Sequence, residues 1–417
     1  MAHESSPSTR TIVILGGSYS GISTAHYLLR HALPTLPHPD MYRVVLVNPS
    51  RDTMCRSACP RAMISDAMFD QSKLFVDIPR QFEQYPDRSF QFLQGRATAL
   101  DHYVRAVTIR AVEGTSETLE YHALVIATGA STPSPLLGPN PDTPHLKQNW
   151  AEFRKALPTA RSIVIAGGGP AGVETAGELG EYLNGRTGWF NSKMDHPKVA
   201  ITIVTAGSQI LPVLRPSLAT KAEKFLAQVG VKVVKNARVV SVTPAGSGTK
   251  TLIQPTTVLL DNSTTLEANI YIPATGTNPN TSFIDPTLLT SDGRVETNKS
   301  TLRVDKAGPR VYALGDAASA ARPAVHLIFE EVPVLCTNIK KDLLMAAGAE
   351  KMTLGEDRAF GEDMSETQMV PIGKSKGVGA AMGWALPSWL IWAIKGRDYW
   401  LWTTGPLWSG KQWTKEK

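Results

Sequence analysis

Two distant segments of the chain share the same order of features: a β-branched and apolar run, a glycine-rich turn, and a stretch of small and apolar residues. We expect a strand, a tight turn and a helix in each. The first consists of residues 11–15, Gly16-Gly17-Ser18-Tyr19-Ser20-Gly21 and residues 22–30, and the second of residues 162–166, Gly167-Gly168-Gly169-Pro170-Ala171-Gly172 and residues 173–183. Further buried strands are expected at 43–47 and 200–204. Repeated β-α-β units of this kind predict an α/β fold with two Rossmann-like domains.

The glycine turns carry a chemical prediction as well. A Gly-x-Gly-x-x-Gly turn lets the backbone approach a pyrophosphate, and the following helix N-terminus offers free N–H groups. With glycine at 33 of 417 positions, about 0.2 matches are expected by chance, so one match alone means little. The second turn matches fully, whereas the first has Ser18 at the middle position, where a small hydroxyl side chain still fits. The repeated context favours two dinucleotide sites over two turns without a ligand.

Later strands indicate that one fold is inserted into the other. Residues 124–126 and 270–273 both lead into Ala-Thr-Gly, and residues 311–313 lead towards Gly315-Asp316. We therefore predict a discontinuous first domain at 1–135 and 268–330, a second domain at 136–267, and a C-terminal α+β region at 331–417. The proline-rich stretch 133–144 is expected to form the first linker.

Taken together, these motifs resemble the pyridine nucleotide–disulfide oxidoreductase superfamily. The closest resemblance is to its apoptosis-inducing-factor-like branch, with ferroptosis-suppressor quinone reductases and fungal members, and type II NADH dehydrogenases are more distant. The resemblance rests on residues 14–18, 48–50, 127–129, 167–174, 274–276 and 315–316. It implies a glutathione-reductase-like arrangement, with FAD bound by the first domain, NAD(P)H by the second, and the nicotinamide stacked on the isoalloxazine.

The resemblance also assigns roles to individual residues. On the FAD side, the pyrophosphate would be held by Gly16, Gly17, Ser18 and Gly21. The backbone of Ala97 would contact the adenine. The rest of the cofactor would be contacted by Arg61, Thr128, Gly129 and Asp316. On the NAD(P)H side, the candidates are Gly167, Gly169, Gly172 and Gly276, with Glu174 as the catalytic candidate that orients the nicotinamide carboxamide. The alternative reading of Glu174 is an acid in the first turn of a helix, favoured by the helix dipole.

Two positions depart from the family pattern. Folds of this type usually end their second strand with an acid that binds the adenosine ribose. The corresponding residues here are Asn48 in the first fold and Thr205 in the second, both treated as cofactor-binding candidates. Thr205 is followed by neither an acid nor an arginine, so the sequence leaves the choice between NADH and NADPH open.

The three cysteines, Cys55, Cys59 and Cys336, are too few for a disulfide scaffold and suit a reducing, cytoplasmic compartment. Cys55 and Cys59 lie in the region where disulfide reductases carry their redox pair, although with three intervening residues rather than four. On a helix this spacing would put both thiols on one face. A thiol–disulfide reductase therefore remains an alternative to two small residues beside the flavin, and Cys336 is expected in the core.

Tryptophan is concentrated near the C-terminus. Seven of the nine follow residue 380, interleaved with Lys395, Arg397 and Lys411: Trp384, Trp389, Trp392, Trp400, Trp402, Trp408 and Trp413. Tryptophan beside basic residues is typical of membrane interfaces, which suggests peripheral membrane contact; the alternative is a core or a homodimer contact. No apolar run approaches the ~20 residues that span a bilayer. The polar residues 1–10 show no secretion core.

The net charge of +6 is modest for 417 residues and forms no basic block, so a nucleic acid partner is not expected. The sequence thus predicts a ping-pong oxidoreductase that passes hydride from NAD(P)H through FAD to a quinone-like acceptor. Two further alternatives are a flavin-dependent oxidase or dehydrogenase of a specialised metabolite, and a redox-sensing protein with slow turnover.

Overall fold

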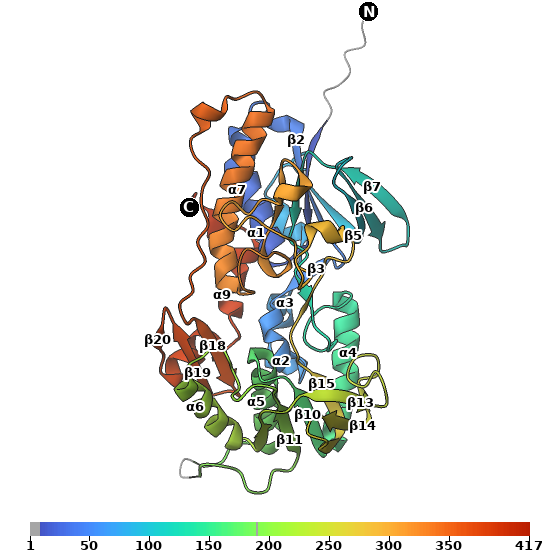
Figure 1. Ribbon diagram of the computed structural model, residues 1–417, viewed down its shortest axis with the longest axis vertical. Coiled ribbons are helices and arrows are strands. Elements are labelled where there is room, and N and C mark those ends of the chain that lie inside the picture. Colours follow the sequence, from blue (N-terminus) through green and yellow to red (C-terminus); the bar gives the residue numbers. More distant parts are fainter. Residues whose placement is uncertain (1–8, 189–190) are drawn as a thin grey trace, which may run out of the picture.

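The structure, a computed structural model, describes residues 9–188 and 191–417, so the predicted polar leader lies almost wholly outside the described residues. The first of its two large sheets has the strand order β17-β8-β1-β2-β5-β6-β7, and its strands β2, β5, β6 and β7 are labelled in Figure 1. From β17 to β5 the strands are parallel, and β5, β6 and β7 form an antiparallel meander. The strands are β1 (Arg10–Leu15), β2 (Tyr42–Asn48), β5 (Phe90–Asp101), β6 (Ala106–Ala111), β7 (Ser116–Glu120), β8 (Ala123–Ile126) and β17 (Val311–Ala313).

The second sheet repeats this plan with the order β12-β11-β10-β15-β14-β13. Here β10 pairs in parallel with β11 and β15, as β1 does with β2 and β8, and β13 to β15 form the antiparallel part. The strands are β10 (Ser162–Ala166), β11 (Ala200–Val204), β12 (Val231–Val234), β13 (Val239–Thr243), β14 (Ile253–Leu260) and β15 (Thr265–Pro273). The α/β class and the two nested Rossmann-like sheets predicted from the sequence are confirmed.

The central strand of the first sheet is buried on both faces. Ile12 and Ile14 belong to one hydrophobic cluster, and Val13 and Leu15 belong to another on the opposite face. Successive side chains of a strand point to opposite faces, so a strand covered on both sides needs an unbroken apolar run. The run Ile12–Leu15 meets this requirement and places the first glycine turn at the carboxyl edge of the sheet.

Each glycine turn leads directly into a helix. α1 (Tyr19–Tyr27) begins after Ser18 and continues as a π helix over Leu28–Ala32, and α5 (Pro170–Asn184) begins after Gly169. Both helices start earlier than the sequence predicts, because the last residues of each turn already have helical backbone. Pro170 suits this position, since the first N–H of a helix has no intrahelical partner.

Two of the predicted domain boundaries fall inside secondary-structure elements. The boundary at 267/268 cuts β15, which pairs with β10 as far as Pro273, so the chain returns to the first sheet only after that residue. The boundary at 330/331 cuts α7 (Val325–Ala346), which packs against α1 of the first domain. The apolar faces of both elements continue across the predicted limits, and composition alone does not mark this continuity.

The C-terminal region joins the two domains. Its three-stranded sheet, β18 (Gln368–Ile372), β19 (Lys376–Ala381) and β20 (Trp384–Ala385), packs against α5 and α6 (Pro216–Ala227) of the second domain. Beyond α8 (Ser388–Ile391) and a π helix over Trp392–Gly396, α9 (Leu401–Trp408) packs against α1. His26 of α1 fixes this contact through Nε2, 2.8 Å from the carbonyl oxygen of Trp408.

The remaining named helices and strands are short except for α4, which follows the linker. They are β3 (Asp52–Met54), α2 (Cys59–Ala62), α3 (Gln71–Leu74), β4 (Phe75–Asp77), β9 (Ala130–Ser131), α4 (Thr143–Ala156) and β16 (Asn278–Pro279). β9 and β16 pair with each other where the two connections between the domains run side by side. Among the described residues, no helix is both long and apolar enough to cross a membrane.

Candidate active site

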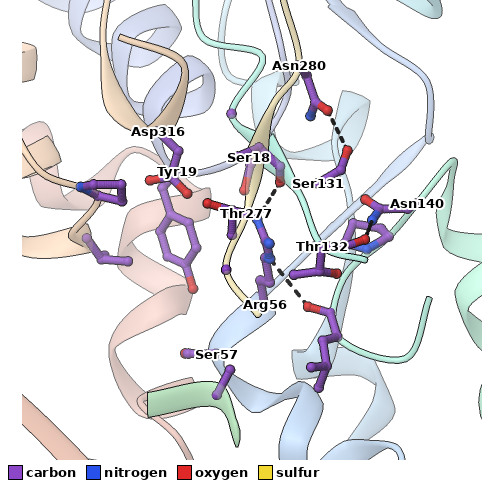
Figure 2. A pocket seen from close by; sticks show the side chains of 18 of the residues that line it. Ser18, Tyr19, Arg56, Ser57, Ser131, Thr132, Asn140, Thr277, Asn280 and Asp316 are labelled. Atoms are coloured by element: carbon purple, nitrogen blue, oxygen red, sulfur yellow. Dashed lines mark hydrogen bonds between the residues drawn. The ribbon is translucent and has the colours of Figure 1, made fainter. Parts of the chain in front are cut away.

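A large cavity of about 1820 Å³ runs between the two domains and the C-terminal region. Both glycine turns line it, as do both Ala-Thr-Gly segments, and α9 contributes Thr403, Thr404 and Leu407. Pockets for one small ligand typically measure about 300–1,000 Å³. The cavity is therefore large enough for more than one ligand, and Figure 2 shows Ser18, Tyr19, Arg56, Thr277 and Asp316 among its lining residues.

The first glycine of each turn is required by the neighbouring backbone. Gly16 and Gly167 have φ values of +112° and +123°, which L side chains rarely adopt. A Cβ on Gly16 would lie 2.2 Å from the carbonyl oxygen of Ala127, and a Cβ on Gly167 would lie 2.1 Å from that of Ala274. Each turn therefore packs directly against its Ala-Thr-Gly segment, and the two sites are built in the same way.

The third glycine of each turn holds the helix against the strand. A Cβ on Gly21 would lie 1.7 Å from the carbonyl oxygen of Gly16, and a Cβ on Gly172 would lie 2.0 Å from that of Gly167. Neither Gly21 nor Gly172 lines the cavity. Both were predicted to bind a cofactor, and the structure gives them a supporting role beneath the turn.

The middle position of each turn faces the cavity. A Cβ built on Gly169 meets no atom within 4 Å, so the space beside it is open. Ser18 occupies the matching position in the first turn and makes no capping hydrogen bond to its helix. Its hydroxyl is therefore available to a ligand, and both residues lie at helix N-termini with unpaired N–H groups, as a bound pyrophosphate requires.

Asn48 and Thr205 occupy equivalent places at the strand ends, and both line the cavity. The Gly17 N–H donates to Oδ1 of Asn48 over 2.8 Å, and Nδ2 of Asn48 donates to the carbonyl oxygen of Ser50 over 2.7 Å. The amide of Asn48 thus fixes the first turn as well as facing the ligand space. A Cβ on Gly168 would lie 2.7 Å from Oγ1 of Thr205, which shows how closely the second turn packs there.

Four more of the predicted cofactor contacts reach the cavity wall. Ala97, Thr128, Gly129 and Gly276 all line it. Oγ1 of Thr128 donates to the carbonyl oxygen of Asn280 over 2.8 Å, and Nδ2 of Asn280 donates back to the carbonyl oxygen of Thr128 over 2.9 Å. Asn280 also accepts a hydrogen bond from Ser131 (Figure 2). These bonds tie the two interdomain connections together beside the site.

Asp316 is mostly buried at the cavity wall, and burial raises the pKa of its carboxyl, while the charges of Arg56 and Arg294 oppose this shift. Arg56 donates from Nη1 to the carbonyl oxygen of Ala130 over 2.6 Å and from Nε to that of Leu137 over 3.3 Å (Figure 2). No carboxylate among the described residues pairs with Arg56, so its positive charge is available to an anionic ligand in the cavity.

Glu331 of α7 supports the Gly315-Asp316 turn. Its Oε2 accepts the Gly315 N–H over 3.0 Å, and burial raises the pKa of its carboxyl to about 7, with Asp316 adding to the rise. In an unfolded chain this pKa is about 4.3, so the folded protein binds a proton that the unfolded chain releases. The free energy of unfolding should therefore fall as pH rises from about 4.3 to 7.

We expect Glu331→Gln to remove this loss, because glutamine keeps the acceptor for Gly315 without a charge. The free energy of unfolding of the variant should exceed that of the parent by about 3 kcal/mol above pH ~7.5 and by little at pH ~4.5. Urea unfolding of both FAD-loaded proteins at the two pH values measures the difference. An equal change at both pH values would show that Glu331 does not titrate as described.

Glu174 lies between the second glycine turn and the C-terminal region. Its Oε1 accepts a hydrogen bond from Nζ of Lys395 over 2.5 Å, and Nζ also donates to the carbonyl oxygen of Met369 over 3.0 Å. Burial raises the pKa of Glu174 to about 7, against the lowering effect of Lys395. Both residues line the cavity, so a buried ion pair faces the space between the two turns.

Arg61 does not line the cavity, in contrast to its predicted place beside the flavin. Its Nη2 and Nε donate to the two carboxylate oxygens of Glu178 over 2.8 and 2.9 Å, and Nη1 donates to the carbonyl oxygen of Gly396 over 2.8 Å. The hydroxyl of Tyr399 also donates to Glu178, over 3.0 Å. Because α2, α5 and the C-terminal region meet here, Arg61 acts as an interdomain clamp.

Cys55 and Cys59 do not share a helix face. Cys55 precedes α2 and has a ψ of +89°, whereas Cys59 is the first residue of that helix. Both are free thiols, buried and absent from the cavity wall. Burial raises the pKa of both, that of Cys59 to about 12. Cys336 is a buried core residue, as predicted.

Sequence reasoning missed Lys395, Arg56 and Glu331 as site residues. The sequence places Lys395 among the basic residues of the tryptophan-rich tail, yet it is buried. Its position three residues after Trp392, within a mostly apolar stretch, was the available signal. Arg56 and Glu331 carry no sequence signal, since their roles depend on contacts with the interdomain linker and with Gly315.

Comparisons with known proteins agree with this geometry. The profile of the family described as pyridine nucleotide-disulphide oxidoreductase matches residues 10–338. The chain is 60% identical to "Oxidoreductase phnG" of Penicillium herquei, with all of both chains covered. It is 24% identical to "Ferroptosis suppressor protein 1" of Xenopus tropicalis, over 93% of this chain and 92% of the other.

Among solved structures, the sulfide:quinone oxidoreductase of Aquifex aeolicus superposes with a TM-score of 0.71 at 14% identity, covering 96% of this chain and 92% of the other. That similarity establishes the fold. The profile match covers well over half of the chain and includes both glycine turns. The chain therefore belongs to the pyridine nucleotide-disulphide oxidoreductase family, and its cofactors are FAD and NAD(P)H.

Proposed function

We propose that this oxidoreductase passes reducing equivalents from NAD(P)H through FAD to a quinone-like acceptor. The observation that carries the proposal is the single cavity that joins both glycine turns, with the Glu174–Lys395 pair lining it. Two nucleotide sites that open into one space allow their redox rings to meet. Binding energy is then used to align the reacting atoms, which is the main contribution a protein makes to cofactor chemistry.

The FAD side would be formed by the first turn, Ala97, Thr128, Gly129 and Asp316, and the open space beside Ser18 fits a pyrophosphate. Arg56 adds a positive charge there that the resemblance does not include. The NAD(P)H side would be formed by the second turn, Thr205 and Gly276. Once both are bound, the nicotinamide supplies hydride to the flavin, which supplies two electrons to the acceptor.

The chain's own groups would bind and orient. Oε1 of Glu174 is fixed by Lys395, which leaves Oε2 as the oxygen without a lysine partner. A carboxamide N–H can donate to such an oxygen, and this contact would set the face that the nicotinamide presents. Lys395 also keeps the ionised form of Glu174 available, since it opposes the effect of burial on the pKa.

The acceptor would enter from the side that the C-terminal region lines. Met369, Trp400, Thr403, Thr404 and Leu407 present apolar surface and hydroxyl groups to the cavity. Such a wall suits a planar ring with oxygen substituents, as in a quinone. The Aquifex aeolicus protein that shares this fold is named a sulfide:quinone oxidoreductase. This name supports a quinone as the acceptor proposed here.

A thiol–disulfide reductase is less favoured, because the reactive form of cysteine is the thiolate. Burial raises the pKa of both Cys55 and Cys59, and neither lines the cavity. A Cys59→Ser variant should retain turnover with quinone.

Sequential mixing tests the proposed acceptor. The FAD-loaded protein is first bleached with one equivalent of NADPH or NADH under anaerobic conditions and then mixed with a soluble quinone. Recovery of flavin absorbance that accelerates with quinone concentration is the expected result. If quinone gives no recovery above buffer while molecular oxygen does, the acceptor assignment is wrong and an oxidase is indicated.

We also propose that the C-terminal region contacts a lipid surface from which a quinone could enter. Four tryptophans there are exposed and two are buried: Trp384 is 78% exposed, Trp389 68%, Trp392 41% and Trp402 55%, whereas Trp408 and Trp413 lie in the core. We refer to these four exposed side chains, together with Met382, as the tryptophan surface. Tryptophan at this density favours membrane interfaces.

We expect the protein to float with liposomes that contain anionic lipid, and the variant Trp384→Ser/Trp389→Ser to lose most of that binding. Tyr103→Ser is the matched control, since Tyr103 is an exposed aromatic residue in the first domain. If the parent protein stays at the bottom of the gradient, or if the control loses binding equally, the tryptophan surface has no lipid role.

A further inference from the structure

The adenosine end of the second nucleotide site contains a residue that the local sequence does not reveal. β11 ends at Val204, and Thr205, Ala206 and Gly207 follow it along the cavity wall. In Rossmann folds an acid near this place binds the ribose 2′-hydroxyl of NAD, whereas a nearby arginine accommodates the 2′-phosphate of NADP. This segment carries neither residue.

A second segment brings an arginine to the same place. The Asn236 N–H donates to the carbonyl oxygen of Gly207 over 3.0 Å, and the Ala237 N–H donates to that of Thr205 over 3.1 Å. Arg238 follows immediately and lines the cavity with Thr205 and Gly207. The arginine is thus 33 residues away from Thr205 in sequence and beside it in space.

The guanidinium of Arg238 is exposed and has no hydrogen-bond or ion-pair partner among the described residues. Asp261 is the nearby acid, and its Oδ1 accepts the backbone N–H of Arg238 over 3.0 Å, not the guanidinium. The neighbouring Lys235 is engaged with Glu223 at 3.1 Å and does not line the cavity. Arg238 is therefore a cation beside the ligand space whose guanidinium forms no ion pair with the described residues.

The rest of the wall at this end is uncharged. Around Arg238 it consists of Thr205, Ala206, Gly207, Ala237 and Val239. A 2′-phosphate carries close to two negative charges at neutral pH, and a guanidinium binds such a group through paired, charge-assisted hydrogen bonds. A ribose 2′-hydroxyl gains little from a cation and would find no carboxylate here.

We infer that the second site takes NADPH in preference to NADH, and that Arg238 is the residue that recognises the 2′-phosphate. This inference rests on the proposed function, because it specifies the nucleotide of that same site. It also resolves the ambiguity left by Thr205, since the position that usually decides the preference is neutral and the deciding charge comes from the residue that precedes β13.

Fragment binding tests the inference without any redox chemistry. Calorimetry on the FAD-loaded, full-length protein compares adenosine 2′,5′-bisphosphate with adenosine 5′-diphosphate. We expect the 2′-phosphorylated fragment to bind at least about tenfold more tightly, as one or two charge-assisted hydrogen bonds provide. Arg238→Ala should remove the difference, Arg238→Lys should keep part of it, and added salt should reduce it.

Lys232→Ala is the matched control, because it removes one exposed positive charge from the adjacent strand β12 without touching the cavity. Its preference between the two fragments should equal that of the parent. Equal binding of the two fragments by the parent protein, or an Arg238→Ala variant with unchanged preference, would overturn the inference.

Flavin reduction separates this inference from the proposed function. If NADPH bleaches the flavin faster than NADH, with the ratio of kcat/KM collapsing in Arg238→Ala, both the inference and the reduction of the flavin by a nicotinamide nucleotide hold. If NADH is equal or better, the inference fails and the function stands. If neither nucleotide bleaches the flavin although the 2′-phosphorylated fragment binds more tightly, the proposed function fails while the 2′-phosphate site remains.

Discussion

In the variant Gly169→Ala, the rate at which a nicotinamide nucleotide reduces the flavin should fall by about a hundredfold or more. The protein should keep its fold and its FAD. The backbone at Gly169, with φ −75° and ψ 178°, accepts alanine, and the new Cβ meets no protein atom within 4 Å. The methyl group would occupy the space in which a nucleotide pyrophosphate meets the backbone. Alanine is a poorer N-cap residue than glycine, which costs about 1 kcal/mol at most.

Anaerobic stopped-flow measures the rate of flavin bleaching, and FAD content and the thermal midpoint report on the fold. Gly361→Ala is the control, because its Cβ also meets no atom within 4 Å and it lies away from the cavity. Gly172→Ala should behave in the opposite way and destabilise the second domain, since its Cβ would lie 2.0 Å from the backbone of Gly167. Normal bleaching by Gly169→Ala would mean that the nucleotide does not bind at this turn.

Glu178→Ala should destabilise the protein by about 3–5 kcal/mol, because it leaves the guanidinium of Arg61 buried without its carboxylate. The side chains of both partners are 6% or less exposed, and two of the three nitrogen atoms of Arg61 donate to Glu178. The same change leaves the hydroxyl of Tyr399 without its acceptor. Since α2, α5 and the C-terminal region meet at this pair, the loss should also loosen the cavity and release FAD at lower temperature.

Urea unfolding of the parent and variant, followed by both flavin fluorescence and far-ultraviolet circular dichroism, gives the difference. Glu296→Ala is the matched control, because its ion pair with Lys306 is about half exposed and such pairs contribute ~0–1 kcal/mol. The double variant Arg61→Met/Glu178→Leu should recover most of the loss, since no buried charge remains. If Glu178→Ala lowers the free energy of unfolding by less than about 1 kcal/mol, the Arg61–Glu178 pair does not hold α2, α5 and the C-terminal region together.

The parts of this molecule that sequence could predict are those governed by local rules. The turns at Gly16 and Gly167 follow from backbone geometry, and the strand over Ile12–Leu15 follows from burial on both faces. The strand and the glycine turn both occur twice in the chain, so the first copy supported the interpretation of the second. The nested order of the two folds followed from the Ala-Thr-Gly segments, which the structure places against the first glycine of each turn.

The contacts that sequence could not predict join residues far apart in the chain. Glu174 and Lys395 are separated by 221 residues, and nothing local distinguishes Lys395 from the exposed lysines of the tail. Arg238 is placed by two backbone hydrogen bonds from the segment that contains it. For Arg61 a family motif pointed to the flavin, and in the structure its guanidinium pairs with Glu178, 117 residues away in the chain. The tryptophans of the C-terminal region also differ in burial, since some lie in the core and others on the surface.

The central claim is that one cavity brings a nicotinamide nucleotide and FAD together for hydride transfer. Anaerobic stopped-flow with the FAD-loaded protein, using NADPH and NADH with and without deuterium at the transferred position of C4, tests it most directly. We predict saturable bleaching of the flavin by at least one nucleotide, slowed by deuterium. A protein whose flavin is bleached by dithionite but by neither nucleotide would contradict the claim and would leave the second glycine turn without a redox role.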